Sequence, residues 1–414
     1  MNKLLLSDLV EDQREFFMGK GCGVAREVDF SRWISHGQVV VISGIRRCGK
    51  STLLRQFAET LDDFHYLNFD DERLFGFGVS DFDDLMQRFQ MRSNTRTLLL
   101  DEIQNVEGWE RFVRRVHDDG YKVVLTGSNA QLLSAELGTR LTGRHVRKEL
   151  FPFSFCEFLA FKGVDPRCRT MEGKAALSGA FNEYLLSGGF PEFLKCGNPE
   201  LLQQTYEDIL FRDIVSRHGI RDVKGFQNLA HYLFSNFTSG MNYNRLKNIL
   251  GFSSAASVRK YIGYLEQSYL ISEIRRYDFS LKKQHVSSKK VYVVDNAMRS
   301  AVSFTFSADR GRLLENLVFM ELRRSGHDVY FQQERGECDF IVLRQNEPAW
   351  AIQVCAELNP GNQDRELQGL QETLEKMPHA EGLILTENQT DEAALPGERN
   401  IPVLPVWRWL TENH

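Results

Sequence analysis

Short apolar runs separated by helical patterns dominate residues 1–150. The runs Val39–Ile42, Thr97–Leu100 and Lys122–Thr126 have the length and hydrophobicity of strands that are buried on both faces of a sheet. Helical periodicity fills the intervals between them, and an amphipathic helix over about residues 4–17 precedes the first strand. Because alternating strands and helices are typical of a parallel sheet, we expect an α/β core in this first domain.

The rest of the chain divides into three further predicted domains. Residues 151–225 have mainly helical patterns, with a break at the glycine pair Gly188–Gly189. Residues 226–305 predict a helix, a turn, a second helix and then a hairpin, which is the element order of a winged helix. Residues 306–414 begin with a helix and continue with strands, so they predict a second α/β unit.

Composition excludes several classes of protein. The chain has 414 residues with a hydrophobic fraction of 42%, which suffices for packed cores and argues against disorder. No apolar run reaches the roughly 18 residues of a membrane span, and no signal peptide is apparent. The 7 cysteines are scattered, without the paired spacing of a metal site. We expect a cytoplasmic protein with reduced thiols and no membrane partner.

The clearest chemical signal is the segment Gly44–Thr52, which lies between a predicted strand and a predicted helix. Gly44 and Gly49 allow backbone N–H groups to turn around phosphate oxygens, and the helix N-terminus favours an anion. Lys50 is placed to reach the β and γ phosphates, and the hydroxyl of Ser51 to bind Mg²⁺. The predicted nucleotide-binding residues are Gly44, Arg46, Arg47, Gly49, Lys50, Ser51 and Thr52.

Two carboxylates end the predicted strand Thr97–Leu100. Asp101 would hold Mg²⁺, directly or through water, together with Ser51. Glu102 would orient and activate the water that attacks the γ-phosphate. This division of roles suits phosphoryl transfer, in which a protein mainly positions groups and stabilises charge. We therefore predict ATP and Mg²⁺ as cofactors.

Polar residues after the strand Lys122–Thr126 are further candidates. Asn129, or alternatively Ser128, is placed to contact the γ-phosphate or the attacking water, although a helix cap explains either residue equally well. Downstream, Arg140 or Arg144 is a candidate arginine finger on the nucleotide of a neighbouring subunit. Surface charge is the alternative for both arginines, and the finger hypothesis implies a homo-oligomer.

Residues 226–305 carry a local excess of positive charge, although the net charge of the chain is −5. Between Arg245 and Lys290, 10 Lys or Arg stand against 3 Asp or Glu. Such a patch is typical of phosphate binding by a winged helix on DNA. The DNA-binding candidates are Arg259 and Lys260 on the second helix, and Lys282 and Lys283 beside the wing, where Lys289 and Lys290 are also expected. A protein contact is the alternative partner for this surface.

Several motifs together resemble a known family. They are Gly-Ile-Arg-Arg-Cys-Gly-Lys-Ser-Thr at 44–52, Leu-Asp-Glu-Ile-Gln at 100–104, Thr-Gly-Ser-Asn at 126–129, Phe-Pro-Phe-Ser at 151–154, Gly-Gly-Phe-Pro-Glu at 188–192 and Gly-Arg-Leu-Leu-Glu-Asn at 311–316. The set resembles the prokaryotic AAA-type (AAA_14-like) P-loop ATPases with a C-terminal DUF4143-type domain of unknown function. The resemblance covers nearly the whole chain. It implies an AAA+ core, a helical lid over 151–225, a winged helix and a nuclease-like C-terminal fold.

The element order of residues 306–414 resembles the restriction-endonuclease-like fold. In that fold an Asp on one strand and a Glu-x-Lys on the next bind Mg²⁺ and activate water. Asp339 takes the first position, and Glu315 lies on the preceding helix. The next strand carries Gln353 and Cys355 in place of the acid and the lysine. Because a thiol cannot supply the ammonium charge, we expect a degenerate site without efficient cleavage.

The leading hypothesis is an Mg-ATP-binding AAA+ ATPase that couples ATP binding and hydrolysis to engagement of DNA or an effector by its C-terminal half. One alternative is a nucleotide-gated signalling switch with slow hydrolysis. Another is an ATP-regulated nuclease. DNA-stimulated ATP turnover would favour the first hypothesis, slow turnover indifferent to DNA the second, and metal-dependent cutting lost on mutation of Asp339 the third.

Overall fold

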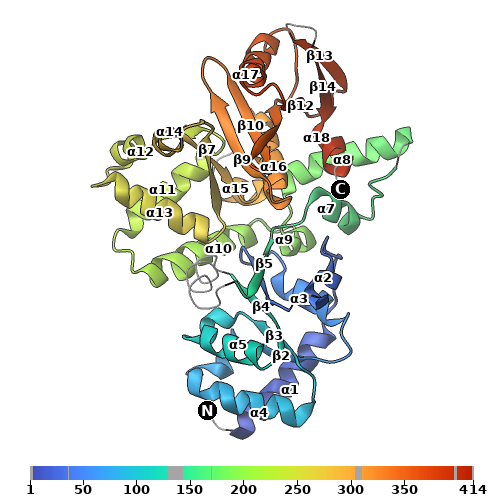
Figure 1. Ribbon diagram of the computed structural model, residues 1–414, viewed down its shortest axis with the longest axis vertical. Coiled ribbons are helices and arrows are strands. Elements are labelled where there is room, and N and C mark those ends of the chain that lie inside the picture. The colour runs from blue at the N-terminus through green and yellow to red at the C-terminus, as the bar shows by residue number, and fades with distance from the viewer. Residues whose placement is uncertain are drawn as a thin grey trace. The chain divides into compact units, whose positions relative to one another are not determined.

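The computed structural model describes residues 3–35, 37–128, 143–168, 170–303, 310–395 and 399–412. The chain forms two compact units, Met1–Phe151 and Pro152–His414, which we treat separately (Figure 1). The division of the chain into four domains stays a prediction.

Five parallel strands form the sheet of the first unit in the order β2-β3-β4-β1-β5. They are β1 (Val39–Gly44), β2 (His65–Asn68), β3 (Thr97–Asp101), β4 (Lys122–Gly127) and β5 (His145–Leu150). Strand interiors are buried on both faces, since the consecutive residues Leu98, Leu99 and Leu100 are all inaccessible to solvent. The predicted parallel α/β core is confirmed. Because the strands are parallel, the carboxyl ends of β1, β3 and β4 lie at one edge of the sheet.

Helices cover this sheet. They are α1 (Lys3–Gly19), α2 (Phe30–Ser35), α3 (Lys50–Ala58), α4 (Phe82–Arg92) and α5 (Trp109–Asp118), with 3₁₀ turns at Glu72–Leu74, Val79–Asp81 and Ile103–Asn105. The predicted N-terminal amphipathic helix is confirmed as α1. Its Leu6 and Leu9 belong to the same buried cluster as Phe82 and Phe89 of α4.

A nine-stranded mixed sheet organises the second unit in the order β13-β14-β12-β11-β10-β9-β7-β8-β6. Its strands are β6 (Gly240–Met241), β7 (Ile271–Arg276), β8 (Lys289–Val293), β9 (Asp328–Gln333), β10 (Glu337–Arg344), β11 (Glu347–Val354), β12 (Glu381–Thr386), β13 (Asp391–Leu395) and β14 (Arg399–Pro405). Strand β7 pairs antiparallel with β8 and parallel with β9. The predicted hairpin strands therefore continue into the C-terminal strands as one sheet.

The helices of the second unit are α7 (Phe155–Lys162), α8 (Met171–Ser187), α9 (Pro191–Cys196), α10 (Glu200–Asp208), α11 (Val223–Ser235), α12 (Tyr243–Leu250), α13 (Ala255–Gln267), α14 (Leu281–Val286), α15 (Asn296–Val302), α16 (Arg310–Arg324), α17 (Gln363–Lys376) and α18 (Val406–Glu412), and α10 continues as a π-helix over Ile209–Ser216. Local sequence signals set the ends of two of them. Gly251 ends α12 in the left-handed conformation, and the hydroxyl of Ser254 caps α13 by accepting from Ser257 N. The helix, turn and helix are confirmed, whereas the winged-helix assignment stays a prediction.

Candidate nucleotide-binding site

The predicted phosphate loop connects β1 to α3. Gly44 ends β1 where a Cβ atom would lie 2.1 Å from the carbonyl oxygen of Leu150, so a side chain does not fit there. Gly49 precedes α3 with φ +100, a conformation that favours glycine. Arg46 and Arg47 lie in the loop itself. The loop conformation therefore depends on both glycines of the motif.

Lys50 is the first residue of α3, and its ammonium group faces back over the loop. Its Nζ atom donates to the carbonyl oxygens of Gly44 and Ile45, both at 3.2 Å, and lies 3.8 Å from Oε1 of Glu102. A phosphate would compete with those carbonyl groups for the ammonium. The Lys50 charge thus already lies at the carboxyl edge of the sheet, next to the acidic end of β3.

Asp101 ends β3 and is held by neighbours on two other strands. The hydroxyl of Thr126 in β4 donates to one of its carboxylate oxygens, and the hydroxyl of Tyr66 in β2 donates to the other at 3.3 Å. Burial raises the pKa of Asp101, and the charge of Glu102 acts in the same direction, while hydrogen bonds from Thr126 and Ser51 oppose them. The carboxylate is therefore fixed beside Ser51, which is the residue pair that the sequence predicts for Mg²⁺.

Glu102 has φ +51, a left-handed conformation that is unfavourable for a residue with a Cβ atom. Its N–H donates to Oγ1 of Thr126 at 3.0 Å, which helps to hold that backbone conformation. Its side chain accepts a hydrogen bond from Nε2 of Gln104, and the same amide lies 3.5 Å from Oγ of Ser128. Backbone strain beside a phosphate loop is typical of functional residues.

Three residues of this site were missed by the sequence analysis: Tyr66, Gln104 and Thr126. Thr126 carried a signal, since it is a polar residue that ends an apolar strand. Gln104 lies only two positions after Glu102, and the 3₁₀ turn at Ile103–Asn105 brings its amide back to that carboxylate. Tyr66 carried no local signal, because its contact with Asp101 depends on the pairing of β2 with β3.

The remaining predicted residues of this unit are only partly placed. Asn129 and Arg140 lie outside the described residues. Arg144 comes just before β5, and its carbonyl accepts from Val39 N at the start of β1, which is the sheet edge opposite the phosphate loop. Its guanidinium is paired with Asp118. Arg144 is therefore distant from the loop of its own chain, and a finger role in a neighbouring subunit stays a prediction.

A cavity of about 800 Å³ adjoins the loop. Residues of α3 and Asp101 line one part of it, and residues of α1, of β2 and of the segments after α1 and β2 line the rest. The volume lies in the range of ligand sites, roughly 300–1,000 Å³. Arg26 contacts the predicted phosphate loop, because it donates to the carbonyl oxygen of Cys48 at 2.9 Å.

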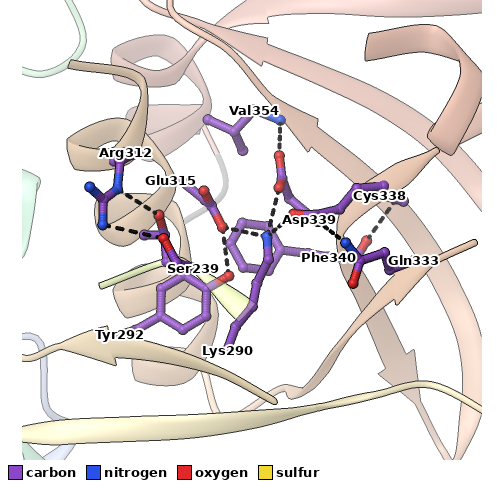
Figure 2. A network of polar contacts seen from close by, with 12 residues as sticks. Ser239, Lys290, Tyr292, Arg312, Glu315, Gln333, Cys338, Asp339, Phe340 and Val354 are labelled. Atoms are coloured by element: carbon purple, nitrogen blue, oxygen red, sulfur yellow. Dashed lines mark hydrogen bonds and ion pairs between the residues drawn. The ribbon is translucent and has the colours of Figure 1, made fainter. Parts of the chain in front are cut away.

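The predicted degenerate nuclease residues come together in the second unit. Glu315 of α16 and Asp339 of β10 both face the Nζ atom of Lys290, at 2.9 and 3.0 Å (Figure 2). Gln353 of β11 accepts from Asp339 N at 3.2 Å. Cys355 is buried nearby, and burial raises the pKa of its thiol to about 12, which keeps it neutral. The expectation that Lys290 flanks an exposed wing is wrong, since Lys290 is buried in β8, which pairs with β7 and β6.

The other predicted basic residues differ in exposure. Lys289 is also buried and donates to the carbonyl oxygen of Ser287 at 3.0 Å, so its placement at a wing surface is wrong too. The four DNA-binding candidates are exposed: Arg259, Lys260, Lys282 and Lys283. Two exposed cations on α13 and two on α14 therefore stay candidates for DNA binding.

Comparisons with known proteins place the chain in a family. A family model described as an AAA domain matches residues 36–159, and two domains of unknown function, DUF8612 and DUF4143, match residues 178–309 and 310–409. An uncharacterized protein of Methanocaldococcus jannaschii is 34% identical, over 98% of this chain and 95% of the relative. The chain belongs to this family of AAA-domain proteins with a C-terminal DUF4143 domain. A relative from Haemophilus influenzae is 30% identical, over 90% of this chain and 94% of its own.

Solved structures resemble the chain only distantly. The Walker-type ATPase of Pyrococcus abyssi aligns with a TM-score of 0.41 and 15% identity, over 69% of this chain and 99% of that chain. AMPPCP-bound DnaA from Aquifex aeolicus aligns with a TM-score of 0.26 and 15% identity, over 57% of this chain and 85% of that chain. At such low scores, nothing about the ligands or partners of the AAA–DUF4143 protein follows from these likenesses.

The two later signature motifs of the AAA–DUF4143 protein meet at one buried polar cluster. Asp295 accepts from Gly189 N at 2.7 Å, and a Cβ atom on Gly188 would lie 2.2 Å from its carboxylate. Asn316 accepts from Val293 N at 2.9 Å and donates to the carbonyl oxygen of the same residue at 3.0 Å. Burial raises the pKa of Asp295 to about 6, against the effect of three backbone N–H groups. The first motif is therefore joined to the residues that follow β8, and the second motif to the end of β8 itself.

No helix in the described part of the chain is both long and apolar enough to cross a membrane.

Proposed function

We propose that the AAA–DUF4143 protein hydrolyses ATP with Mg²⁺ at the carboxyl edge of the first sheet. One observation carries this proposal: Lys50, on a strand–loop–helix element that fits phosphate groups, lies beside Asp101 and Glu102 at the end of β3. Ser51 and Asp101 would hold Mg²⁺, which neutralises charge on the phosphates when it is bound. The 800 Å³ cavity beside Ser51 and Thr52 is the candidate place for the rest of the nucleotide.

The residues of the site have distinct roles in the proposal. The ammonium of Lys50 binds phosphate oxygens in place of the Gly44 and Ile45 carbonyl groups that it contacts now. The carboxylate of Glu102 accepts a proton from the attacking water and orients it. The Thr126 hydroxyl fixes both Asp101 and the backbone of Glu102 through two hydrogen bonds.

A second candidate function is a nucleotide-gated switch with slow hydrolysis. The observation that favours it is the hydrogen bond from Gln104 to Glu102, which engages the carboxylate that a water molecule needs. Replacing Gln104→Ala should raise the ATP turnover rate of the isolated protein if that hydrogen bond restrains Glu102. An unchanged or lower rate would mean that Gln104 instead supports the active geometry, and would remove this argument for a switch.

We also propose that the C-terminal half engages nucleic acid through the exposed cations of α13. Arg259 and Lys260 are adjacent on the second helix of a helix–turn–helix, where a winged helix contacts phosphates. The nine-stranded sheet includes strands that fit a nuclease-like fold, in which β10 and β11 are antiparallel and β11 and β12 parallel. A protein partner for the same surface is the competing proposal.

The deciding experiment measures ATP turnover with and without duplex DNA over a range of salt concentrations. Stimulation by DNA that weakens steeply as salt rises would support phosphate contacts. The variant Arg259→Glu with Lys260→Glu should lose this stimulation while its basal turnover is unchanged. The reversal Lys282→Glu with Lys283→Glu on α14 tests the second group of cations in the same assay. DNA-indifferent turnover in the native chain would refute nucleic-acid engagement and leave the ATPase proposal intact.

A further inference from the structure

A lysine is enclosed by three carboxylates in the second unit, at the place where the nuclease-like fold would hold a metal ion. The Nζ atom of Lys290 lies 2.9 Å from Oε1 of Glu315, 3.0 Å from Oδ1 of Asp339 and 2.5 Å from Oε1 of Glu337. The side chain of Lys290 is only 2% exposed. Figure 2 shows the ammonium between Glu315 and Asp339. We call Lys290 and these three acids the ammonium cage.

The ammonium contacts every acid of the cage. It donates hydrogen bonds to Glu315 and Asp339 and forms an ion pair with Glu337, and it has no acceptor atom of its own. Each acid is also held by a second donor: the Tyr292 hydroxyl binds Glu315 at 2.7 Å, and Val354 N binds Asp339 at 3.0 Å. Nε2 of Gln333 binds the third acid, Glu337, at 3.0 Å. The acids are therefore fixed in a geometry built around one central cation.

Three observations show that the residues do not fit a divalent ion while Lys290 is present. Magnesium and calcium take oxygen ligands at roughly 2.0–2.6 Å, whereas two of the cage oxygens lie at about 3 Å from a nitrogen that occupies the centre. Gln353, which replaces the expected acid, donates its amide to Oε2 of Glu366 at 2.8 Å. In the described part of the chain, no group of three or more His, Cys, Asp or Glu is suited to hold a metal.

We propose that Lys290 is the permanent cation of this site. The ammonium takes the place of a divalent ion, so the native site binds no metal. The cage also fastens β8, which belongs to the 226–305 segment, to α16 and β10 of the DUF4143 domain. This role concerns the C-terminal fold and does not depend on the proposed ATPase activity.

The proposal predicts what happens when the ammonium is removed. Lys290→Met keeps an unbranched side chain that ends before the ammonium position, and it leaves three acids, two of them buried, without their cation, which is strongly destabilising. Those acids need to move by less than about 1 Å to reach metal–oxygen distances. Glu337 is partly exposed, with 37% of its side chain accessible, so an ion has a route from solvent. The variant should therefore gain a site for a divalent cation.

The test is thermal denaturation of the nucleotide-free full chain with and without millimolar Mn²⁺, together with calorimetric titration of Mn²⁺. Lys290→Met should have a lowered Tm that Mn²⁺ raises by several degrees, and should bind Mn²⁺ at least about tenfold more tightly than the native chain. Adding Asp339→Asn to this variant should abolish the Mn²⁺ response. Lys289→Met is the matched control, because that neighbouring lysine donates to the carbonyl oxygen of Ser287 and lies over the ring of Tyr243, and it should show no response.

A titration that needs no change at Lys290 decides the outcome if Lys290→Met does not fold. The native chain and Asp339→Asn should then bind Mn²⁺ identically. Mn²⁺ binding by the native chain that disappears in Asp339→Asn would overturn the proposal, because the site would hold a metal despite Lys290. A folded Lys290→Met variant without Mn²⁺ binding would overturn it too.

Discussion

Replacing Glu102→Gln should separate ATP binding from hydrolysis. The amide keeps the size of the side chain, and its oxygen can still accept the hydrogen bond from Nε2 of Gln104. It cannot accept a proton from water. General-base catalysis contributes about 10²–10⁴ in rate, so we expect the hydrolysis rate to fall by a factor on the order of 10² or more, about 2.7 kcal/mol at the lower bound.

Binding should change little in that variant. Glu102 lies 3.8 Å from the Lys50 ammonium, and a unit pair at that distance has an interaction of at most about 4 kcal/mol at an effective dielectric of roughly 20. Its side chain is 20% exposed, so solvent screens much of this attraction. Loss of the Glu102 charge frees Lys50 from its partner, which weakens ATP binding, but it also removes a repulsion from the phosphates, which strengthens binding. ATP affinity should therefore be equal or tighter.

Calorimetry with ATP and a phosphate-release assay measure the two effects. Lys50→Ala should abolish binding, because it removes the phosphate-binding charge. The exposed Glu107→Gln is the matched control and should leave both binding and turnover unchanged. Turnover at the native rate in Glu102→Gln would remove Glu102 from the mechanism, and loss of ATP binding in it would show that the carboxylate supports the loop instead.

Two further predictions concern stability. Gly188→Ala should destabilise the second unit by at least about 2 kcal/mol in urea unfolding, because Gly188 has φ +60 and a Cβ atom there would overlap Asp295. Gly179→Ala is the control: it has open space at its Cβ position and should be neutral or slightly stabilising. Equal effects at the two sites would contradict this reasoning. Burial lowers the pKa of His65 to about 4 from 6.5, so the unfolded chain binds the proton first and the stability of the first unit should fall as pH decreases from about 6.5 to 4. The variant His65→Leu should lose that part of the pH dependence, and an unchanged profile would mean that His65 does not carry it.

Local patterns were sufficient to predict that the candidate nucleotide-binding residues lie at one edge of the sheet, because these residues follow the ends of apolar strands. Lys50 and Ser51 come after the apolar run Val39–Ile42, and Asp101 and Glu102 after another, and parallel pairing alone brings strand ends to one edge. The residues that hold the acids in place could not be predicted in the same way. Tyr66 reaches Asp101 across two paired strands, which no sequence spacing reveals.

The location of β8 was the main feature that the sequence did not determine. Its residues Lys289 and Lys290 resemble the charged edge of a wing, since two consecutive lysines are usually exposed. Their burial depends on a long-range event, the parallel pairing of β7 with β9, which joins the hairpin to the C-terminal strands. All five residues of β8 are buried, so its lysines need acids or carbonyl groups as partners.

The same burial changes the argument about nuclease activity. Cys355 lacks the ammonium of the expected Glu-x-Lys, so the sequence alone predicts that the site has lost a positive charge. In the structure an ammonium is present, but it comes from Lys290 on β8 and binds Glu315 and Asp339 together. Both acids that could hold a metal are thereby occupied, and Gln353 adds no charge to compete for an ion. The lysine therefore removes the case for metal-dependent cleavage more strongly than the cysteine does, because it blocks the metal ligands that had survived in the sequence.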